Sequence, residues 1–472
     1  PANSYTWKEF LNLAGDISDE KLDRVIDSQK PNQCCTLVYT MGSTNLSKIV
    51  MLSHDNITWT TAATVQSLCY KCPPEGQEVL VSYLPLSYIK AQIFDMWVAI
   101  LVAGTLYFAP PEAGRGFLMD MLQEVQPTTF YGTPWIWERM LDNLKTSQLD
   151  SSPFRRKLDC WAMKLGFPWV CFSRKVHPPL CFRLAKMLTF NRARKFLGLS
   201  HCEQFFNIGP GLPTATLDFF LSLNIPIFEL YGLSEGTGIH TLSSHQAFRL
   251  PSCGKGLPNT HTKVKENEKC IGNICIWGRN IFMGYLNDKE GTQKMMDCYG
   301  WMNTGDLGCL DVNGFLYVLG NVKGEAGSGE KINPRPIEER VKMHIPIVRH
   351  VMVVGQDAPY LCALLTLKVP WTVWDALTSE AVAFCRKLKS QSTRLTDILH
   401  KHDPVVMEFI SQGIKAVNAE APSESARIIK WAILDTDFSV GGGELGITER
   451  LKRVAVAKMY QAEIDDFYKD FG

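Results

Sequence analysis

The chain has 472 residues, 46% of them hydrophobic and 21% charged, so it is long enough for two to four domains of ~150 residues with sizeable cores. Its 49 basic and 48 acidic residues leave a formal net charge of +1, which excludes a polyanion-binding field over the whole molecule. With 35 Gly and 25 Pro, the composition excludes disordered, collagen-like and low-complexity classes. Its 15 cysteines are typical of reduced thiols in a cytosolic protein.

Short apolar runs alternate with longer amphipathic segments along the chain. Strands are expected over residues 36–40, 79–83, 105–108, 128–131, 227–230, 273–277 and 315–319, and helices over 117–125 and 214–223. This alternation predicts an α/β fold with largely parallel sheets. The longest apolar stretch, 96–109, is shorter than the ~20 residues that a membrane-spanning helix needs, so we expect a buried helix followed by a strand. Residues 1–16 lack the basic start and apolar block of a secretory signal peptide.

Residues 151–200 carry eleven Lys or Arg side chains against a single acid, Asp159, with large apolar side chains in between. This mixture is typical of a surface that faces anionic lipid, and it also suits an acidic small molecule. A solvated basic face is the alternative. Because no recognised nucleic-acid-binding module accompanies the stretch, we do not expect nucleic acid as a partner.

Residues 321–333 mark a second change in composition, since they are rich in Gly, Lys and Glu and contain no apolar run. Such a segment is typical of a linker or hinge between two domains. We therefore predict a large domain over residues 1–320 and a smaller C-terminal domain over residues 321–472.

The segment from Thr36 to Asn56 places a hydroxyl-rich loop with a single lysine, Lys48, after a predicted strand. Backbone N–H groups and Ser/Thr hydroxyls in such a loop can surround phosphate oxygens, and a lysine can supply a point charge. The loop does not follow the Gly-x-x-x-x-Gly-Lys-Ser/Thr pattern of P-loop NTPases. An ordinary Ser/Thr turn is the alternative.

This loop resembles the phosphate loop of the adenylate-forming acyl-CoA synthetases, the AMP-binding family, and four further blocks match that family in order. The blocks are Ser-Tyr-Leu-Pro-Leu-Ser-Tyr at 82–88, Tyr-Gly-Leu-Ser-Glu-Gly-Thr at 231–237, Gly-Trp-Met-Asn-Thr-Gly-Asp at 300–306 and Gly-Glu-Leu-Gly-Ile-Thr-Glu-Arg-Leu-Lys-Arg at 443–453. The sequence between the blocks is most similar to the bubblegum branch, which activates long and very long fatty acids. The resemblance implies a large N-terminal adenylate-forming domain, incomplete at its start, and a small mobile α+β C-terminal domain.

The resemblance assigns roles to individual residues. Tyr231 would stack on adenine, Asp306 would accept hydrogen bonds from both ribose hydroxyls, and Glu235 would hold Mg²⁺, which prefers oxygen ligands. Further contacts with ATP or AMP are implied for Ser43, Thr44, Lys48, Ser234 and Asn321. Catalysis would depend on Glu235, Lys48 and Arg450, which aligns with the family's catalytic lysine. Lys323 matches the hinge around which the small domain rotates.

The implied reaction has two steps. A long-chain fatty acid attacks the α-phosphate of Mg·ATP to give acyl-adenylate and pyrophosphate, and the thiol of coenzyme A then displaces AMP. ATP and coenzyme A are therefore the expected co-substrates and Mg²⁺ the expected cofactor, and the enzyme acts by positioning and by neutralising charge. We expect a cytoplasmic enzyme in peripheral contact with the endoplasmic reticulum membrane through residues 151–200.

Several positions depart from the family pattern where the chemistry would occur. The departures are Met41, Asn45, Ser47 and Ile49 in the phosphate loop, and Tyr88, Ile208, Asn321, Gly324 and Arg450 elsewhere. Ile49 and Ile208 replace glycines, and a β-branched residue adopts positive φ only under strain. Arg450 keeps the charge of the expected lysine but has a wider, planar head.

Two interpretations of these departures compete. The first is a long-chain acyl-CoA synthetase with weakened chemistry, and the second is a catalytically silent relative that binds nucleotide, acyl chains or a protein partner. A truncated or poorly folding product is a third. As a hypothesis we place the acyl tunnel near the aromatic stretch 130–137, for which plain core packing is the alternative.

Overall fold

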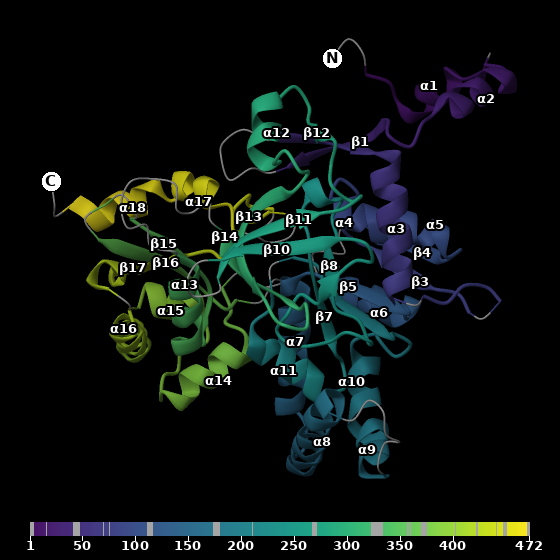
Figure 1. Ribbon diagram of the computed structural model, residues 1–472. Helices are drawn as coiled ribbons and strands as arrows, with labels where there is room; N and C mark the ends of the chain where they lie inside the picture. Colours follow the sequence, from purple (N-terminus) through teal and green to yellow (C-terminus); the bar gives the residue numbers. More distant parts are fainter. Residues whose placement is uncertain are drawn as a thin grey trace.

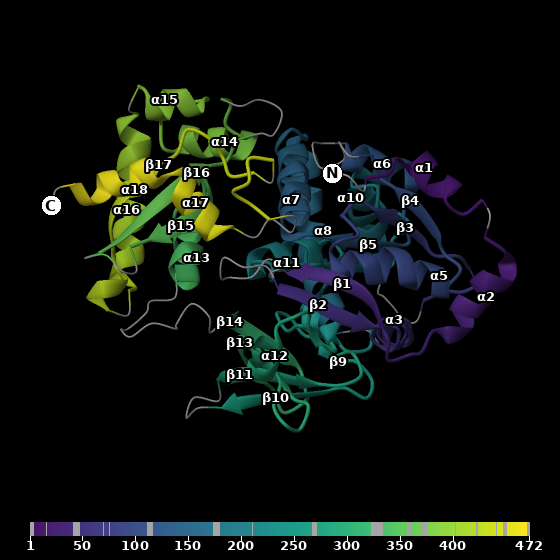
Figure 2. The same cartoon turned by 90° about the horizontal axis from the view of Figure 1, so that it is seen from above.

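The structure is a computed structural model, and it describes residues 4–15, 17–40, 48–68, 70–74, 76–110, 117–172, 180–209, 211–266, 271–321, 334–355, 358, 360–369, 375–401, 403–421, 423–439, 441–446 and 451–469. A large unit of several sheets, coloured purple to teal, leads into a smaller green and yellow unit at the C-terminal end (Figure 1 and Figure 2). Helices cover the sheets in both units, and the expected α/β class is confirmed.

Parallel strands form the centre of the large unit. One sheet pairs β3 (Val79–Ser82) with β4 (Thr105–Phe108). A second sheet contains the parallel strands β5 (Thr129–Gly132), β6 (Gln204–Asn207) and β7 (Ile227–Tyr231). The short strands β8 (Thr241–Leu242) and β9 (Lys255–Gly256) extend this second sheet beyond β7 in antiparallel pairing. Every residue of β5, β6 and β7 is buried. Because these strands are covered on both faces, their sequences are continuous apolar runs with little alternation.

Helices of the large unit pack on these strands and enclose two hydrophobic clusters. They are α3 (His54–Leu68), α4 (Ile89–Ala91), the π-helix η1 (Gln92–Val98), α5 (Ala99–Leu101), α6 (Leu118–Val125), α7 (Pro134–Leu149), α8 (Pro153–Phe172), α9 (Leu180–Ala185), the π-helix η3 (Lys186–Phe190), α10 (Asn191–Phe196) and α11 (Thr214–Ser222). The first cluster surrounds Phe94 and Tyr231, and the second surrounds Trp137 and Phe220.

Two antiparallel sheets lie beside the parallel strands. They are β1 (Cys34–Thr40), β2 (Lys48–Ser53) and β12 (Gly284–Tyr285), and β10 (His261–Glu266), β11 (Gly272–Trp277), β13 (Met302–Leu310) and β14 (Leu316–Asn321). The connections β10–β11 and β13–β14 are short, and a short connection forces antiparallel pairing because a parallel one needs a crossover of a dozen residues or more. Fewer strands are therefore paired in parallel than the alternation of strands and helices along the sequence predicts.

The C-terminal unit is built around a three-stranded sheet. Its elements are α13 (Pro334–His344), β15 (Val348–Val354), β16 (Leu361–Leu367), α14 (Ser379–Lys387), α15 (Leu395–Leu399), α16 (Pro404–Ala419), β17 (Ile428–Ile433), α17 (Arg453–Met459) and α18 (Gln461–Tyr468). At the other end of the chain, α1 (Trp7–Asn12) and α2 (Asp19–Ser28) extend away from the large unit and bury no residue (Figure 1).

The elements expected from the sequence are confirmed within two residues at each end. The apolar stretch 96–109 forms the end of η1, then α5 and β4, but only one face of it is buried, and Ile100 is 67% exposed. No helix within the described ranges combines the length and apolar character that a bilayer crossing requires.

Ion pairs join the two units at α7. Arg349 on β15 lies 3.5 Å from Asp142 of α7 and 3.5 Å from Asp437, and its side chain is 11% exposed. Lys145 of α7 lies 3.7 Å from Glu380 on α14. The hydrophobic clusters themselves stay within residues 38–316 or within 337–467. The boundary between residues 320 and 321 remains a prediction.

Replacing Arg349 by Met would leave Asp142 and Asp437 without their shared cation. We expect the free energy of unfolding to fall by about 3 kcal/mol, as for a broken buried ion pair. The matched control is Arg427→Met, because the Arg427–Glu424 pair is exposed (46% and 90%) and such pairs contribute less than ~1 kcal/mol. Urea unfolding checks this, and equal losses in the two variants would contradict it.

Candidate functional site

The site begins where β7 ends. Tyr231 is the last residue of this buried strand, and the 3₁₀ turn η4 (Ser234–Gly236) follows it directly. The turn is tight, since a Cβ on Gly232 would lie 2.5 Å from the carbonyl oxygen of Gly238. The turn carries Glu235 back against the sheet, where it is 9% exposed. Open α/β sheets place their ligands at this carboxyl end of the strands.

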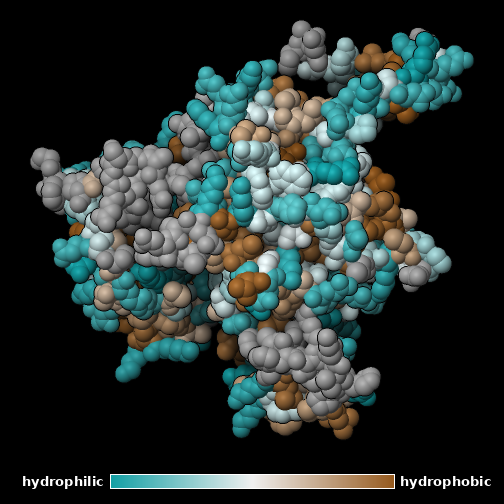
Figure 3. All heavy atoms as spheres, viewed as in Figure 1, coloured by the Kyte–Doolittle hydropathy of each residue, from teal (hydrophilic) through white to brown (hydrophobic). Residues whose placement is uncertain are grey.

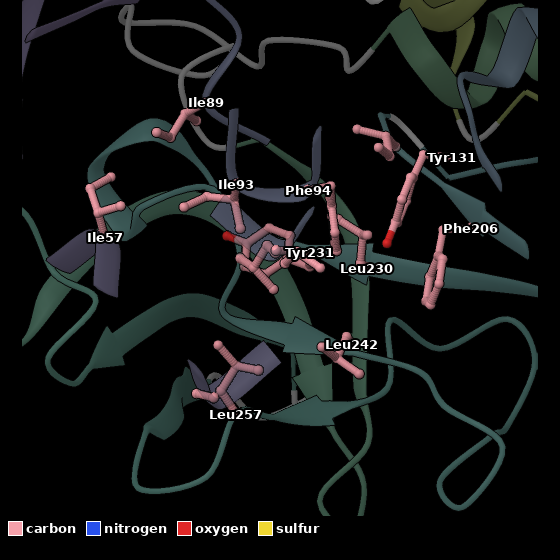
Figure 4. Close-up of a cluster of buried hydrophobic side chains, with 14 of the residues drawn as sticks. Ile57, Ile89, Ile93, Phe94, Tyr131, Phe206, Leu230, Tyr231, Leu242 and Leu257 are labelled. Atoms are coloured by element: carbon pink, nitrogen blue, oxygen red, sulfur yellow. The ribbon is translucent and has the colours of Figure 1, made fainter. Parts of the chain in front are cut away.

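A hydrogen bond joins Tyr231 to Asp306. The phenol donates to Oδ2 of Asp306 over 2.8 Å and so ties β7 to β13 of the neighbouring antiparallel sheet. Burial and the adjacent Asp306 hold the pKa of Tyr231 well above its usual range, so the phenol stays a donor. Figure 4 shows the Tyr231 side chain among the buried side chains of Ile93, Phe94 and Leu230. The ring expected to stack on adenine is thus packed in the first hydrophobic cluster.

Asp306 and Asn321 are cross-strand partners in the β13–β14 ladder. The sequence analysis placed both at the nucleotide, and the structure brings their backbones together. The backbone N–H of Asp306 also donates to Oγ1 of Thr304 over 3.1 Å, within β13.

A second group connects Glu235 to Lys48 through Tyr285. The phenol of Tyr285 donates to Oε1 of Glu235 over 2.6 Å, and the ammonium of Lys48 lies 4.3 Å from the centroid of the same ring. Lys48 also lies 3.2 Å from Asp288, where both side chains are about one third exposed (36% and 38%). Lys48 is the first residue of β2, and β12 pairs with that strand, so the backbone ladder sets this arrangement.

Tyr285 and Asp288 were not among the residues predicted from the sequence for this group. Asp288 caps α12 (Lys289–Met295), because its carboxylate accepts from the backbone N–H of Gly291 over 2.8 Å. That hydrogen bond, followed by Lys48, lowers the pKa of Asp288. An acid just before a predicted helix is a capping signal, but its contact with Lys48 bridges 240 positions of sequence and has no local signature.

The remaining predicted site residues are less constrained by the structure. Ser234 is half-buried at the start of η4, and its carbonyl accepts from the N–H of Thr237 over 3.1 Å. Ser43, Thr44, Lys323 and Arg450 lie outside the described residues, as do the departures Met41, Asn45, Ser47 and Gly324. Within the described ranges, no group of three or more His, Cys, Asp or Glu residues is placed to hold a metal ion.

Four departures from the family pattern, Ile49, Tyr88, Ile208 and Asn321, lie in described segments, and two of them replace glycines. Ile49 is an ordinary strand residue of β2, paired with Tyr39, so the strain expected for a β-branched residue at positive φ does not arise. Ile208 is 1% exposed and belongs to the same hydrophobic cluster as Tyr231. Its backbone N–H donates to the carbonyl of Gly132 over 2.8 Å, which fixes the segment after β6.

Glu229 is a buried acid that the sequence analysis also missed. It lies within β7 at 2% exposure and accepts from the Nδ2 of Asn207 over 2.9 Å and from the backbone N–H of Leu212 over 3.1 Å. It therefore holds the 207–212 segment against the site. Burial raises the pKa of Glu229 to about 7. A lone acid inside an apolar strand was the available sequence signal.

Two further ionisable side chains are buried near the site. Lys90 is 5% exposed, and burial lowers its pKa to about 8, while the charges of Glu229 and Asp306 oppose that effect. Asp95 is 5% exposed, and burial raises its pKa to about 7. Both interrupt the apolar pattern of residues 89–102, which was the signal that could have identified them.

The aromatic stretch 130–137 is tightly packed. Trp137 is fully buried, lies edge-on to Phe130 and Phe220 at 5.3 Å each, and donates its indole N–H to the carbonyl of Phe206 over 3.1 Å. Tyr131 stacks on Phe94 at 4.1 Å. These contacts favour core packing for Trp137, the alternative to a tunnel wall.

The buried Glu229 makes stability depend on pH. The ordinary pKa of a Glu side chain is 4.5 and that of Glu229 in the fold is about 7, so the folded state holds more protons than the unfolded state between these values. The free energy of unfolding therefore falls as pH rises through that window. Glu229→Gln removes this dependence. The difference in free energy of unfolding between Glu229→Gln and the unmodified chain should therefore shift by about 3 kcal/mol in favour of the variant from about pH 5 to about pH 8.

Urea unfolding at the two pH values measures this difference. Glu124→Gln, an exposed acid on α6, is the matched control and should show no such pH-dependent gain. A constant difference between Glu229→Gln and the unmodified chain at both pH values would contradict the assignment.

Two family models match the chain. A model described as AMP-binding enzyme matches residues 4–286, and a model of the AMP-binding enzyme C-terminal domain matches residues 326–472. The chain is 46% identical to long-chain-fatty-acid–CoA ligase ACSBG2 of Gallus gallus, over 99% of this chain and 63% of that protein. It is 45% identical to ACSBG2 of Mus musculus and 43% identical to ACSBG1 of Homo sapiens, over 99% of this chain and 72% and 66% of those proteins. The chain thus spans about two thirds of the length of the curated relatives it matches.

Solved structures share the fold at low identity. ATP-bound MatB from Rhodopseudomonas palustris gives a TM-score of 0.61 at 17% identity, over 99% of this chain and 83% of that chain. The A domain of carboxylic acid reductase from Segniliparus rugosus, in complex with AMP and a co-purified carboxylic acid, gives 0.62 at 16% identity, over 94% and 62%. At these identities the likeness shows the fold alone.

Proposed function

The chain belongs to the AMP-binding enzyme family, and from that premise we propose that it is an ATP-dependent long-chain fatty acid CoA ligase of the bubblegum type, with weakened chemistry. The family resemblance drawn from the five sequence blocks is confirmed by the family models and the curated relatives. The observation that carries the proposal is the convergence of Tyr231, Glu235, Asp306 and Lys48 near the carboxyl end of β7.

In the proposed adenylation step these residues position ATP and neutralise its charge. Asp306 would accept hydrogen bonds from the ribose once Tyr231 releases it. Lys48 would exchange Asp288 for phosphate oxygens. An ion pair whose side chains are about one third exposed contributes at most ~1 kcal/mol, so this exchange costs little. The carboxylate of the fatty acid then attacks the α-phosphate, pyrophosphate leaves, and coenzyme A displaces AMP in the second step.

Glu235 would hold Mg²⁺. Its Oε1 accepts from Tyr285, and its second carboxylate oxygen has no hydrogen bond within the described part of the chain. A single carboxylate suits a Mg²⁺ ion that keeps several waters and is otherwise bound by phosphates. When bound, the ion would neutralise phosphate charge, while Tyr285 fixes the orientation of the carboxylate.

A catalytically silent nucleotide-binding relative is the second candidate. Ile208 packs in the core where the family has a glycine beside adenine. The phenol of Tyr231 also donates a hydrogen bond to the carboxylate of Asp306 that a ribose would need. Both features would raise the cost of admitting a nucleotide. Arg450 in place of a lysine favours the same candidate, because a lost charge contact in such a site costs about 2.7–4 kcal/mol of the barrier.

The proposed location is the cytoplasm, with peripheral contact to the endoplasmic reticulum membrane. The basic and apolar stretch 151–200 supports it, because long-chain fatty acids partition into bilayers. Imaging of a tagged full-length protein with an endoplasmic reticulum marker tests this location.

The experiment that tests the function is acyl-CoA formation from a long-chain fatty acid, Mg·ATP and coenzyme A, read by mass spectrometry. Arg450→Lys and a phosphate-loop variant (Met41→Ser, Asn45→Gly, Ser47→Pro, Ile49→Gly) run in parallel. We expect weak product from the unmodified chain and more from both variants. If only the variants formed product, while the unmodified chain and both variants all bound ATP, the result would favour the catalytically silent candidate. Absence of both product and ATP binding in every version would contradict both candidates.

Nucleotide affinity tests the roles of Asp306 and Tyr231 separately. Asp306→Asn should weaken ATP binding roughly 10- to 100-fold, because a hydrogen bond to a charged group contributes ~1.5–3 kcal/mol. Tyr231→Phe keeps the ring and releases Asp306, so it should bind ATP at least as tightly as the unmodified chain. Titration calorimetry measures both.

Asp120→Asn, an exposed acid on α6, is the matched control and should leave ATP affinity unchanged. Weaker binding by Tyr231→Phe would mean that the phenol itself contacts the nucleotide and would contradict the proposed competition.

A further inference from the structure

Helix α8 and the segment from α9 to α10 form an outlying part of the large unit, at its lower end in Figure 1. Their inner side chains pack inward, because Ala162, Phe182 and Phe190 belong to the second hydrophobic cluster and α8 contacts α11. The outward side, which we call the α8–α10 face, comprises the exposed residues of these helices. It lies away from the strands that carry Tyr231 and Asp306 (Figure 1).

The α8–α10 face carries an excess of positive charge. Its exposed cations are Arg156, Lys157, Lys164, Arg183, Lys186, Arg192 and Lys195. The single acid of the stretch, Asp159, is 7% exposed, lies 2.8 Å from Arg155 and accepts from Thr189 over 2.9 Å. The described residues of 151–200 therefore present cations and no exposed carboxylate to solvent.

Large apolar side chains are exposed among these cations. Phe154 is 78% exposed, Leu180 73% and Met187 62%, and Trp161 and Leu184 are also exposed. Leu180, Leu184 and Met187 recur at helical spacing, as do Phe154 and Trp161, so each set lies along one side of its helix. In Figure 3 both hydrophilic and hydrophobic residues are visible at the lower end of the molecule.

We propose that the α8–α10 face docks on an anionic lipid bilayer. The apolar side chains would enter the boundary between headgroups and acyl chains, while the long Lys and Arg side chains reach the phosphates and carboxylates of the headgroups. Charge complementarity alone would also admit nucleic acid. The aliphatic Leu180, Leu184 and Met187 favour lipid, because a nucleic acid is bound through cations and stacking rings.

The proposal rests on the membrane contact put forward under the proposed function and assigns it a face and a lipid class. Vesicle flotation tests it and does not depend on ligase activity, so its failure is distinguishable from failure of the proposed ligase reaction. The vesicles are phosphatidylcholine alone, or with about 30 mol% phosphatidylserine, at low and high salt. We expect binding to the anionic vesicles that weakens with salt. The triple variant Arg156→Glu, Lys157→Glu, Lys164→Glu should lower the partition coefficient on the order of 100-fold, at ~1 kcal/mol per cation.

The matched control reverses three exposed lysines of the C-terminal unit, Lys342→Glu, Lys387→Glu and Lys415→Glu, and makes the same change in net charge. It should bind anionic vesicles as the unmodified chain does. A second variant, Leu180→Asn, Leu184→Asn, Met187→Gln, keeps the cations and should lose the binding that survives high salt. Circular dichroism confirms that each variant is folded.

Three results would overturn the proposal. The first is binding that changes neither with phosphatidylserine content nor with salt. The second is an equal loss of vesicle binding in the control variant. The third is displacement of the protein from anionic vesicles by a single-stranded oligonucleotide that binds the variant Leu180→Asn, Leu184→Asn, Met187→Gln as tightly as it binds the unmodified chain. The last result would assign the face to nucleic acid.

Discussion

The hydrogen bond from Tyr231 to Asp306 is the contact on which the arrangement of the site depends. It joins the end of a buried parallel strand to an antiparallel strand 75 positions later in the sequence, and so links the two sheets at the site. Because Tyr231 is buried and Asp306 is half-buried, the bond is worth more than it would be in water, and leaving the phenol unsatisfied would be costly. In the proposed function, a ribose would have to compete with the phenol of Tyr231 for the carboxylate of Asp306.

Tyr285 has the corresponding role for Glu235. Its phenol orients that carboxylate, and the face of its ring holds the ammonium of Lys48, so one aromatic side chain couples an acid and a cation that η4 and β2 supply separately. The two tyrosines therefore organise the charged groups before any ligand arrives. Charged groups that are already in place need little reorientation when charge develops in a transition state. A site without a protein nucleophile contributes to a reaction mainly in this way.

The elements that position the site could be predicted from the sequence, because β7 is a continuous apolar run and the blocks that end in Asp306 and begin with Tyr231 are distinctive. The contacts of Asp288 and Glu229 could not be predicted, because their partners are distant in sequence and depend on strand register. At Ile49 the sequence predicted a feature that the structure does not have. Comparison with a glycine loop predicts strain there, but the β2 ladder accommodates the residue in ordinary extended geometry.

The central claim is that nucleotide binds at the junction of β7, η4 and β13, whether or not the chain is an active ligase. Hydrogen–deuterium exchange with and without Mg·ATP tests it most directly, because it reports location independently of product formation. The account predicts slower exchange in peptides that cover residues 229–240, 284–292 and 302–321. Unchanged exchange in all three, at ATP concentrations that saturate binding, would contradict it.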